Sequence, residues 1–221
     1  MCTKLKKSEA LTYRGVYALT SPHCFQTQSV DTFVNELAKA QVRWLQFRDK
    51  SQDKTSRMTT ALQLRELTRE HDITLIINDD VELAQAVEAD GVHLGQKDTD
   101  LQTARDKLGQ QAIIGATCHN SLILAQKAIE HSADYIAFGS LFPSNSKPEA
   151  TPAKIDTLLE ASHNFGVPIV GIGGIDATNI QLVAQSGAQM AAVVAALYTE
   201  ENVELAARKL QAGFWSNEQQ V

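Results

Sequence analysis

Short apolar segments alternate with longer amphipathic segments eight times along this chain of 221 residues, and no other feature constrains its fold more. The apolar segments predict strands over residues 16–19, 44–47, 74–77, 91–93, 113–116, 135–138, 169–172 and 190–194. The segments that follow them predict helices over residues 31–40, 54–71, 81–87, 101–108, 121–130, 152–162, 178–185 and 203–214. This alternation predicts an α/β fold, a single-domain (β/α)8 TIM barrel over residues 1–221, although a doubly wound parallel sheet would show the same pattern.

Local signals mark several helix ends. We expect Asp31 and Thr178 to cap helix N-termini and Pro152 to occupy a first helical position. Gly109 and Gly187 follow helical segments, where a left-handed C-cap favours glycine. The N-terminus and the polar C-terminal tail lack such signals, and we expect both to be frayed.

The composition limits the partners of the chain. Asp and Glu outnumber Lys and Arg by 26 to 20, and the net charge of −6 argues against a nucleic-acid partner. No apolar run reaches the roughly 18 residues of a membrane span, and no apolar stretch follows the basic start as in a secretory signal. The 3 cysteines are odd in number and lack CxxC spacing, which favours reduced thiols and a cytoplasmic location. Small molecules, phosphates included, are the expected partners, and homo-oligomerisation stays open.

Polar residues gather after the predicted strands, at the barrel end where TIM barrels hold their active sites. In the segment Gln46-Phe47-Arg48-Asp49-Lys50, the alternating Gln46, Arg48 and Lys50 would share one face of an extended backbone. Three donors on one face suit an anion or a heterocycle, because Arg supplies a planar fork and Lys a point charge. The alternative is an exposed polar edge whose basic residues pair with Asp49.

Two aspartates follow neighbouring predicted strands. Asp79 and Asp98 could together hold Mg²⁺, which binds through one or two carboxylates with substrate phosphate and water. Alternatively, Asp79 or Asp80 caps the helix that begins near residue 81, and Asp98 caps the helix near residue 101. The residues alone leave both interpretations open.

Two further loops suit an anionic ligand. Ser144-Asn145-Ser146-Lys147 combines hydroxyls, an amide and a cation, and the glycines of 171–174 allow a ligand close to the backbone. An ordinary polar turn and a tight turn are the simpler alternatives. His93 and His119 are the candidate acid–base groups, but packing or hydrogen bonding is the more frequent role of such residues. Cys118 is a poor candidate nucleophile, because its neighbour His119 points the opposite way on a strand.

Taken together, these motifs resemble those of the thiamine phosphate synthase family, and the match runs from about Tyr13 to Tyr198. Each motif is weak alone, but six in this order and spacing are specific. They are Gln46-x-Arg48-x-Lys50, Ile77-Asn78-Asp79, Ala89-Asp90-Gly91-Val92-His93-Leu94-Gly95-Gln96-x-Asp98, Gly115-x-Thr117-x-His119, Gly139-x-x-Phe142-Pro143-x-x-Ser146-Lys147-Pro148 and Ile172-Gly173-Gly174-Ile175.

The resemblance implies a (β/α)8 barrel enzyme, a transferase of thiamine biosynthesis. It would join hydroxymethylpyrimidine diphosphate to a thiazole phosphate and release pyrophosphate by a dissociative mechanism assisted by Mg²⁺. The resemblance assigns Asp79 and Asp98 to Mg²⁺, and we place Arg48, Lys147 and Thr117 in catalysis. The pyrimidine diphosphate would contact Gln46, Phe47, Arg48, Asp49, Lys50, Asn78, Thr117 and Lys147, and the thiazole phosphate would contact Ser144, Asn145, Ser146, Gly174, Val194 and Ala195.

The chain departs from the family pattern at several of these positions. Ser144 and Ser146 stand where Thr is usual, and Thr117 stands where Ser is usual, so all three hydroxyls are retained. Ala195 replaces a usual Ser, which leaves only a backbone contact at that position. Asp80 stands where a basic residue is common and adds negative charge beside the metal site.

Three other functions compete with the synthase. A thiazole tautomerase on the same barrel would not need the diphosphate and metal groups. A phosphate-binding protein without catalysis would be expected to lose the metal carboxylates first. An interaction module would leave the whole donor set unexplained. Retention of Arg48, Asp79, Asp98 and Lys147 together favours the synthase.

Overall fold

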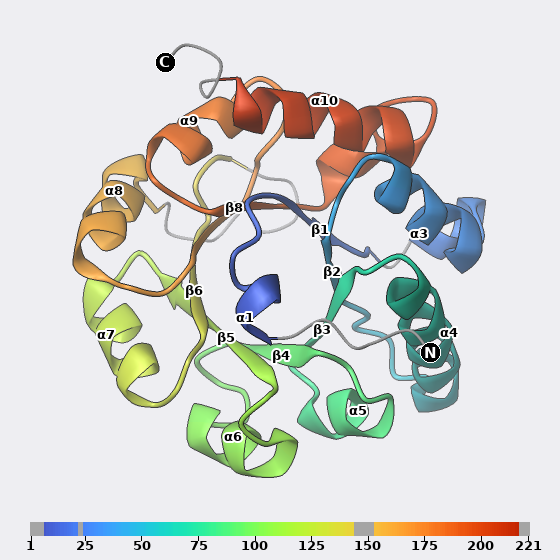
Figure 1. Cartoon of the computed structure of the whole chain (residues 1–221), viewed down its shortest axis with the longest axis horizontal. Coiled ribbons are helices and arrows are strands. Elements are labelled where there is room, and N and C mark those ends of the chain that lie inside the picture. Colours follow the sequence, from blue (N-terminus) through green and yellow to red (C-terminus); the bar gives the residue numbers. More distant parts are fainter. Residues whose placement is uncertain (1–6, 22–23, 144–152, 217–221) are drawn as a thin grey trace.

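The computed structural model describes residues 7–21, 24–143 and 153–216. Parallel strands β1 to β8 close into a barrel in chain order, and β8 pairs back with β1 (Figure 1). This closure confirms the predicted (β/α)8 barrel and excludes an open doubly wound sheet. The strands are β1 (Gly15–Leu19), β2 (Trp44–Phe47), β3 (Thr74–Asn78), β4 (Gly91–Leu94), β5 (Ile113–His119), β6 (Tyr135–Phe138), β7 (Ile169–Ile172) and β8 (Met190–Val193).

The helices form a ring around the strands (Figure 1). All eight predicted helices are present, with ends that differ by at most three residues. The short helices α1 and α2 and the 3-10 helix η1 were not predicted. The helices are α1 (Lys7–Ala10), α2 (Cys24–Thr27), α3 (Val30–Lys39), α4 (Lys54–Glu70), α5 (Val81–Ala86), α6 (Leu101–Leu108), α7 (Leu122–Glu130), α8 (Ile155–Asn164), α9 (Ile180–Gln185), η1 (Ala195–Tyr198) and α10 (Val203–Trp215).

The helix caps correct two predictions. Ser29, not Asp31, caps α3, because its hydroxyl accepts a hydrogen bond from the backbone N–H of Thr32 at 3.0 Å. Thr178 does not cap α9; its hydroxyl and N–H instead bond the carboxylate of Asp176 in the preceding turn. The glycine predictions are confirmed, since Gly109 and Gly187 both adopt a φ of 81°. Pro152 lies outside the described residues.

Apolar residues form two separate cores. The larger one lies between the sheet and the helices. The smaller one fills the barrel interior, where aromatic side chains from β1, β2 and β6 pack together. The buried apolar residues of this interior are Ala10, Tyr17, Leu19, Trp44, Ile76, Ile113, Tyr135, Ala137, Val170, Met190 and Ala192. Because side chains fill the barrel, ligands are restricted to its ends.

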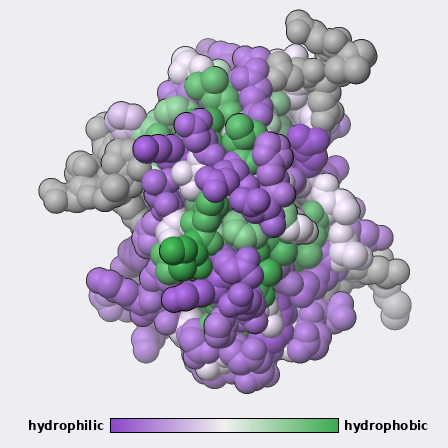
Figure 2. Space-filling view, turned by 90° about the vertical axis from the view of Figure 1, so that its left-hand side faces the viewer, coloured by the Kyte–Doolittle hydropathy of each residue, from purple (hydrophilic) through white to green (hydrophobic). Residues whose placement is uncertain are grey.

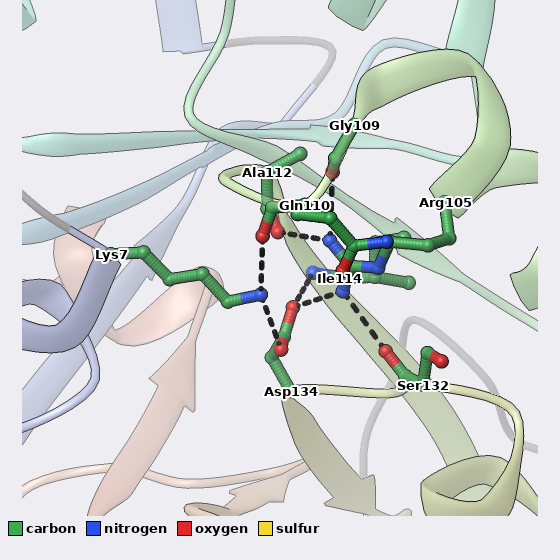
Figure 3. Close-up of polar contacts among 8 residues, drawn as sticks. All are labelled: Lys7, Arg105, Gly109, Gln110, Ala112, Ile114, Ser132 and Asp134. Carbon is green, nitrogen blue, oxygen red and sulfur yellow. Dashed lines mark hydrogen bonds and ion pairs between the residues drawn. The ribbon is translucent and has the colours of Figure 1, made fainter.

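Helix α1 covers the amino end of the barrel, at the centre of the strand ring in Figure 1. Its residue Ala10 is buried, and the Ala10 carbonyl accepts a hydrogen bond from the indole N–H of Trp44 at 3.0 Å. Lys7 pairs with Asp134 at 2.7 Å (Figure 3). From Lys7 onward, the chain is therefore held by contacts with residues far along the sequence.

Side-chain acceptors at the amino end follow a regular pattern. The residue before each of three even-numbered strands accepts the N–H of the odd-numbered strand beside it. Asp90 accepts from Leu75 of β3 at 2.9 Å, Asp134 from Ile114 of β5 at 2.8 Å, and Gln189 from Ile169 of β7 at 2.7 Å. Arg65 also binds Asp90, and Arg105 binds Asp134. At this end, three side chains therefore tie neighbouring strands together through hydrogen bonds.

The outer face over α7 and α8 carries apolar atoms between polar ones (Figure 2). The large exposed apolar side chains of these two helices are Ile123 and Leu159, which are 71% and 42% exposed. Homo-oligomerisation stays open. None of the helices that the structure describes combines the length and apolarity that a membrane span requires.

Candidate active site

Those predicted ligand residues that the structure describes lie around the carboxyl end of the barrel, which we call the mouth. Gln46 faces the barrel interior from β2, as Trp44 does; it is buried, and its amide N–H donates to the hydroxyl of Tyr17 at 2.9 Å. Lys50 lies beyond the strand and is exposed, and its Nζ bonds the carboxylate of Asp79, the residue after β3, at 2.8 Å. Gln46 and Lys50 thus lie at different depths of the same mouth.

The backbone of Arg48 is fixed by a threonine that the sequence analysis did not identify. Thr20 follows β1, and its hydroxyl accepts from the Arg48 N–H at 2.8 Å and donates to the Arg48 carbonyl at 3.1 Å. The half-buried Arg48 side chain therefore starts from a fixed backbone. The rule that polar residues after barrel strands belong to the site would have identified Thr20.

Two other residues of the Gln46–Lys50 segment have local structural contacts. The buried Phe47 side chain belongs to the core between the sheet and the helices, so it faces away from the barrel interior. A carboxylate oxygen of Asp49 accepts from the Ser51 N–H at 2.7 Å and stabilises the turn after β2. A substrate contact by Phe47 would have to come from its backbone.

The predicted metal residues form one carboxylate pair. Burial raises the pKa of Asp79, but Lys50, Asp98 and Asn78 outweigh that effect and hold the pKa below its ordinary value. Burial and the neighbouring Asp79 raise the pKa of Asp98, against the Gly95 N–H that donates to it at 2.7 Å. Asp79 also adopts a left-handed φ of 63°, a strained conformation for a non-glycine residue at the end of β3.

The structure decides between capping and other roles for the nearby aspartates. Asp80 caps α5 through the N–H of Leu83 at 2.9 Å, and Arg57 pairs with it at 2.6 Å, so its extra charge is balanced. Asp100, not Asp98, caps α6. Asp79 and Asp98 therefore have no part in capping these helices.

Two neighbouring carboxylates fit the oxygen chemistry of Mg²⁺, which needs one or two of them in addition to phosphate and water oxygens. Within residues 7–21, 24–143 and 153–216, no group of three or more His, Cys, Asp or Glu side chains could hold a metal ion. A magnesium ion held by Asp79 and Asp98 would thus need further oxygen ligands besides these two carboxylates.

Thr117 lies on β5 beside the β-bulge between Thr117 and His119. Its hydroxyl lies 2.9 Å from Nε2 of His93 on β4, and its carbonyl accepts from the Gln96 side chain at 2.6 Å. Gln96 was not assigned a role, although it stands within the motif around Asp98. Cys118 is buried, which raises the pKa of its thiol to about 12 and agrees with its exclusion as a nucleophile.

The glycines after β7 pack against the loop that follows β6. Gly173 and Gly174 have φ values of 104° and 62°, and a Cβ on Gly174 would lie 2.5 Å from the carbonyl oxygen of Pro143. The N–H of Phe142 donates to the Gly173 carbonyl at 3.0 Å. The tight turn that was the simpler interpretation is therefore present, and it brings the loops after β6 and β7 together.

The remaining predicted residues fall into three groups. Asn78 ends β3 and is half-buried. Val194 and the exposed Ala195 follow β8, where η1 begins. Ser144, Asn145, Ser146 and Lys147 lie outside the described residues.

Comparisons with known proteins agree on one family. The chain matches the family model described as thiamine monophosphate synthase over residues 16–197. It is 45% identical to a thiamine-phosphate synthase of Saccharophagus degradans, over 88% of this chain and 90% of that protein. It is 40% identical to that of Alcanivorax borkumensis, over 92% of this chain and 95% of that protein. The solved thiamine phosphate pyrophosphorylase from Pyrococcus furiosus has a TM-score of 0.83 and 29% identity, covering 94% of this chain and 98% of that one.

Proposed function

Because this chain belongs to the thiamine monophosphate synthase family and is a transferase, we propose that it joins a hydroxymethylpyrimidine diphosphate to a thiazole phosphate. The C–O bond to the diphosphate breaks first, and its electron pair leaves with the pyrophosphate. The aminopyrimidine ring delocalises the positive charge left on the methylene carbon. The thiazole nitrogen then donates its lone pair to that carbon, which completes thiamine phosphate.

Positive groups at the mouth would hold the departing diphosphate. Arg48 and Lys50 follow β2, and Lys147 follows β6 in the sequence. Asp79 and Asp98 would hold Mg²⁺, which when bound supplies positive charge beside the diphosphate. Fixed charges that face the developing negative charge lower the barrier to C–O cleavage, because they need no reorganisation during the reaction.

The other residues of the mouth would orient the two rings. Gln46, Asn78 and Thr117 would contact the pyrimidine, and Ser144, Asn145, Ser146, Gly174, Val194 and Ala195 would surround the thiazole phosphate. Holding both rings at reaction distance replaces a bimolecular encounter with an intramolecular step. This mechanism needs little proton transfer, so it requires neither His119 nor the protonated Cys118 thiol.

One observation carries the proposal most directly. Lys50 bonds Asp79, and Asp79 in turn is close enough to Asp98 to raise the pKa of that carboxyl group. This arrangement suits a complex of a metal ion with a diphosphate. The metal would relieve the repulsion between the two carboxylates, and the Lys50 ammonium group would bind the phosphate.

A pyrophosphate-release assay tests the proposal. We expect release from hydroxymethylpyrimidine diphosphate only when thiazole phosphate and Mg²⁺ are both present, with thiamine phosphate confirmed by mass. Absence of release from folded protein that binds both substrates would contradict it. Thiazole isomerisation that survives Asp98→Ala and is lost in His119→Ala would identify the tautomerase instead.

A further inference from the structure

A network of four hydrogen bonds crosses the barrel interior beneath the mouth. The Gln46 amide N–H donates to Tyr17 at 2.9 Å, and the Tyr17 and Tyr135 hydroxyls lie 3.1 Å apart. The Tyr135 hydroxyl lies 2.9 Å from Nδ1 of His93, whose Nε2 lies 2.9 Å from the Thr117 hydroxyl. We call these five residues the interior network. It begins and ends at two residues to which the proposed function gives a substrate contact.

We propose that Tyr17, Tyr135 and His93 are positioning residues, which fix the hydrogen-bond direction of Gln46 and Thr117 toward the pyrimidine ring. This inference rests on the proposed function for the identity of the ligand. The three residues act through Gln46 and Thr117 rather than by touching the substrate.

Counting protons gives the direction of each bond. The Gln46 amide nitrogen can only donate, so the Tyr17 oxygen accepts and gives its own proton to Tyr135. Tyr135 then gives its proton to Nδ1 of His93. A neutral histidine that accepts at Nδ1 carries its proton on Nε2, so His93 donates to the oxygen of Thr117. The reverse direction would place the proton of the buried Tyr17 hydroxyl outside the network.

This direction determines what the two end residues offer to a ligand. The network uses one N–H of Gln46 and a lone pair of the Thr117 oxygen. The carbonyl oxygen of Gln46 and the hydroxyl hydrogen of Thr117 remain outside it. An aminopyrimidine has an amino group that donates and ring nitrogens that accept, so one acceptor and one donor match it.

The packing around Tyr135 indicates a fixed geometry. A Cβ on Gly115 would lie 2.0 Å from Cζ of Tyr135, so only glycine at this position of β5 leaves room for the ring. Trp44 meets the ring edge-on at a centroid distance of 5.3 Å, and His93 stacks on it at 5.4 Å. Gly115 belongs to the same sequence motif as Thr117. Its role is explained by the need to admit the Tyr135 ring into the barrel.

The burial of the two tyrosines keeps their protons in place. Tyr17 and Tyr135 are 1% and 0% exposed, and burial raises the pKa of both hydroxyls above the ordinary value. Both hydroxyls are thus protonated at neutral pH, as the direction of the bonds requires.

Nitrogen-15 NMR of the histidine-labelled wild-type protein without ligand tests the bond directions independently of activity. We expect the His93 signal, assigned with His93→Asn, to show the Nε2–H tautomer. Tyr135→Phe removes the hydroxyl that donates to Nδ1 of His93 and keeps the aromatic ring. We therefore expect a mixture of the two His93 tautomers in that variant. An Nδ1–H tautomer in the wild type, or no change in Tyr135→Phe, would overturn the proposal.

Steady-state kinetics test the positioning role. We expect Tyr135→Phe and, separately, Tyr17→Phe to raise KM for the pyrimidine diphosphate about tenfold and to leave KM for the thiazole phosphate unchanged. Tyr135→Phe should raise KM less in the Thr117→Ala variant than in the wild type. In that variant the Thr117 hydroxyl, which Tyr135 is proposed to position, is already absent.

Tyr13→Phe is the matched control. The Tyr13 hydroxyl also has two hydrogen bonds, to the Val16 carbonyl at 2.9 Å and from Gln211 at 3.1 Å, but it lies near the amino end of β1. Equal KM increases in this control, or unchanged KM in both interior variants, would overturn the positioning role. A wild type that shows the Nε2–H tautomer but makes no thiamine phosphate would instead overturn the proposed function, and the pyrimidine-specific positioning with it.

Discussion

The two ends of this barrel use the same residue types in opposite ways. At the amino end, both oxygens of Asp134 are bonded, one to Lys7 and the other to Arg105 and the Ile114 N–H (Figure 3). At the mouth, Asp98 accepts from the Gly95 N–H and faces a second carboxylate that raises its pKa. One aspartate is surrounded by compensating donors, and the other is close to a group that repels it.

The partners of a carboxylate indicate whether it serves stability or function more clearly than its position or residue type does. A carboxylate whose partners all favour its charge contributes to folding. A carboxylate beside a like charge costs stability, and proteins keep such groups where a ligand or metal completes them. The amino end is therefore expected to control stability, and the mouth to control turnover.

The largest expected effect comes from breaking the cluster of Lys7, Arg105 and Asp134, which we call the amino-end cluster. Asp134→Asn leaves the charge of Arg105, whose side chain is 2% exposed, without its counter-ion. We expect the free energy of unfolding to fall by about 3–5 kcal/mol, a large share of the total for a domain. Urea denaturation measures this loss, and turnover per folded molecule should stay unchanged.

The exposed pair of Glu204 with Arg208 on α10 provides the control for that variant. Glu204→Gln should change the free energy of unfolding by at most about 1 kcal/mol, because water screens the pair. An equal fall in the free energy of unfolding in the two variants would show that the burial of Arg105 does not cause the effect of Asp134→Asn.

At the mouth, Asp98→Ala should produce the opposite result. We expect turnover to fall about 100-fold to 1,000-fold, because Asp98 would hold the Mg²⁺ whose positive charge stabilises the departing diphosphate. Thermal stability should hold or rise, since the repulsion with Asp79 is removed. The Mg²⁺ concentration that gives half-maximal activity should rise, because one of the two carboxylates that would hold the metal is lost. Asp100→Ala, two residues along the same loop, should leave turnover unchanged.

A fall in melting temperature with unchanged specific activity in Asp98→Ala would reverse the comparison. It would mean that Asp98 stabilises its loop through the Gly95 N–H and serves no catalytic purpose.

A smaller effect is expected from replacing one lysine by methionine at each end of the barrel. Lys147→Met should weaken diphosphate binding about tenfold to 100-fold, as for loss of a charged hydrogen bond. Lys7→Met should lower the melting temperature and leave diphosphate affinity unchanged, because Lys7 bonds only the amino-end cluster in the described contacts. Calorimetric titration with inorganic pyrophosphate measures the diphosphate affinity of both variants, and thermal melting measures their stability. Equal affinity in the wild type and Lys147→Met would remove Lys147 from the site.

The sequence predicted the barrel because its strands are mostly buried on both faces and are therefore largely apolar. It also predicted the mouth, because polar residues that follow parallel strands meet at one end. It missed α1, since four residues show no helical period, and the helix is held by distant partners such as Trp44. It missed the interior network, whose residues come together only through the register of β1, β2, β4, β5 and β6.

Helix caps show a finer limit of sequence reasoning. Ser29 and Asp31 are both good capping residues two positions apart, and only the backbone angles of Ser29 place its hydroxyl on the Thr32 N–H. Likewise Asp79 and Asp80 are adjacent and chemically alike, yet Asp80 caps α5 and Asp79 bonds Lys50. Neighbouring residues of one type receive different roles because the backbone directs each side chain differently.

The smallest expected effect tests whether location at the mouth is sufficient for function. Ser121 follows the mouth residue His119, but its hydroxyl accepts the N–H of Leu124 and caps α7. We expect Ser121→Ala to lower the free energy of unfolding by about 1 kcal/mol, the usual contribution of an N-cap, and to leave turnover unchanged. Thermal melting and the pyrophosphate assay measure the two effects. A loss of turnover without a loss of stability would mean that the loop after β5 contacts substrate through Ser121, and that capping does not exclude a role in the site.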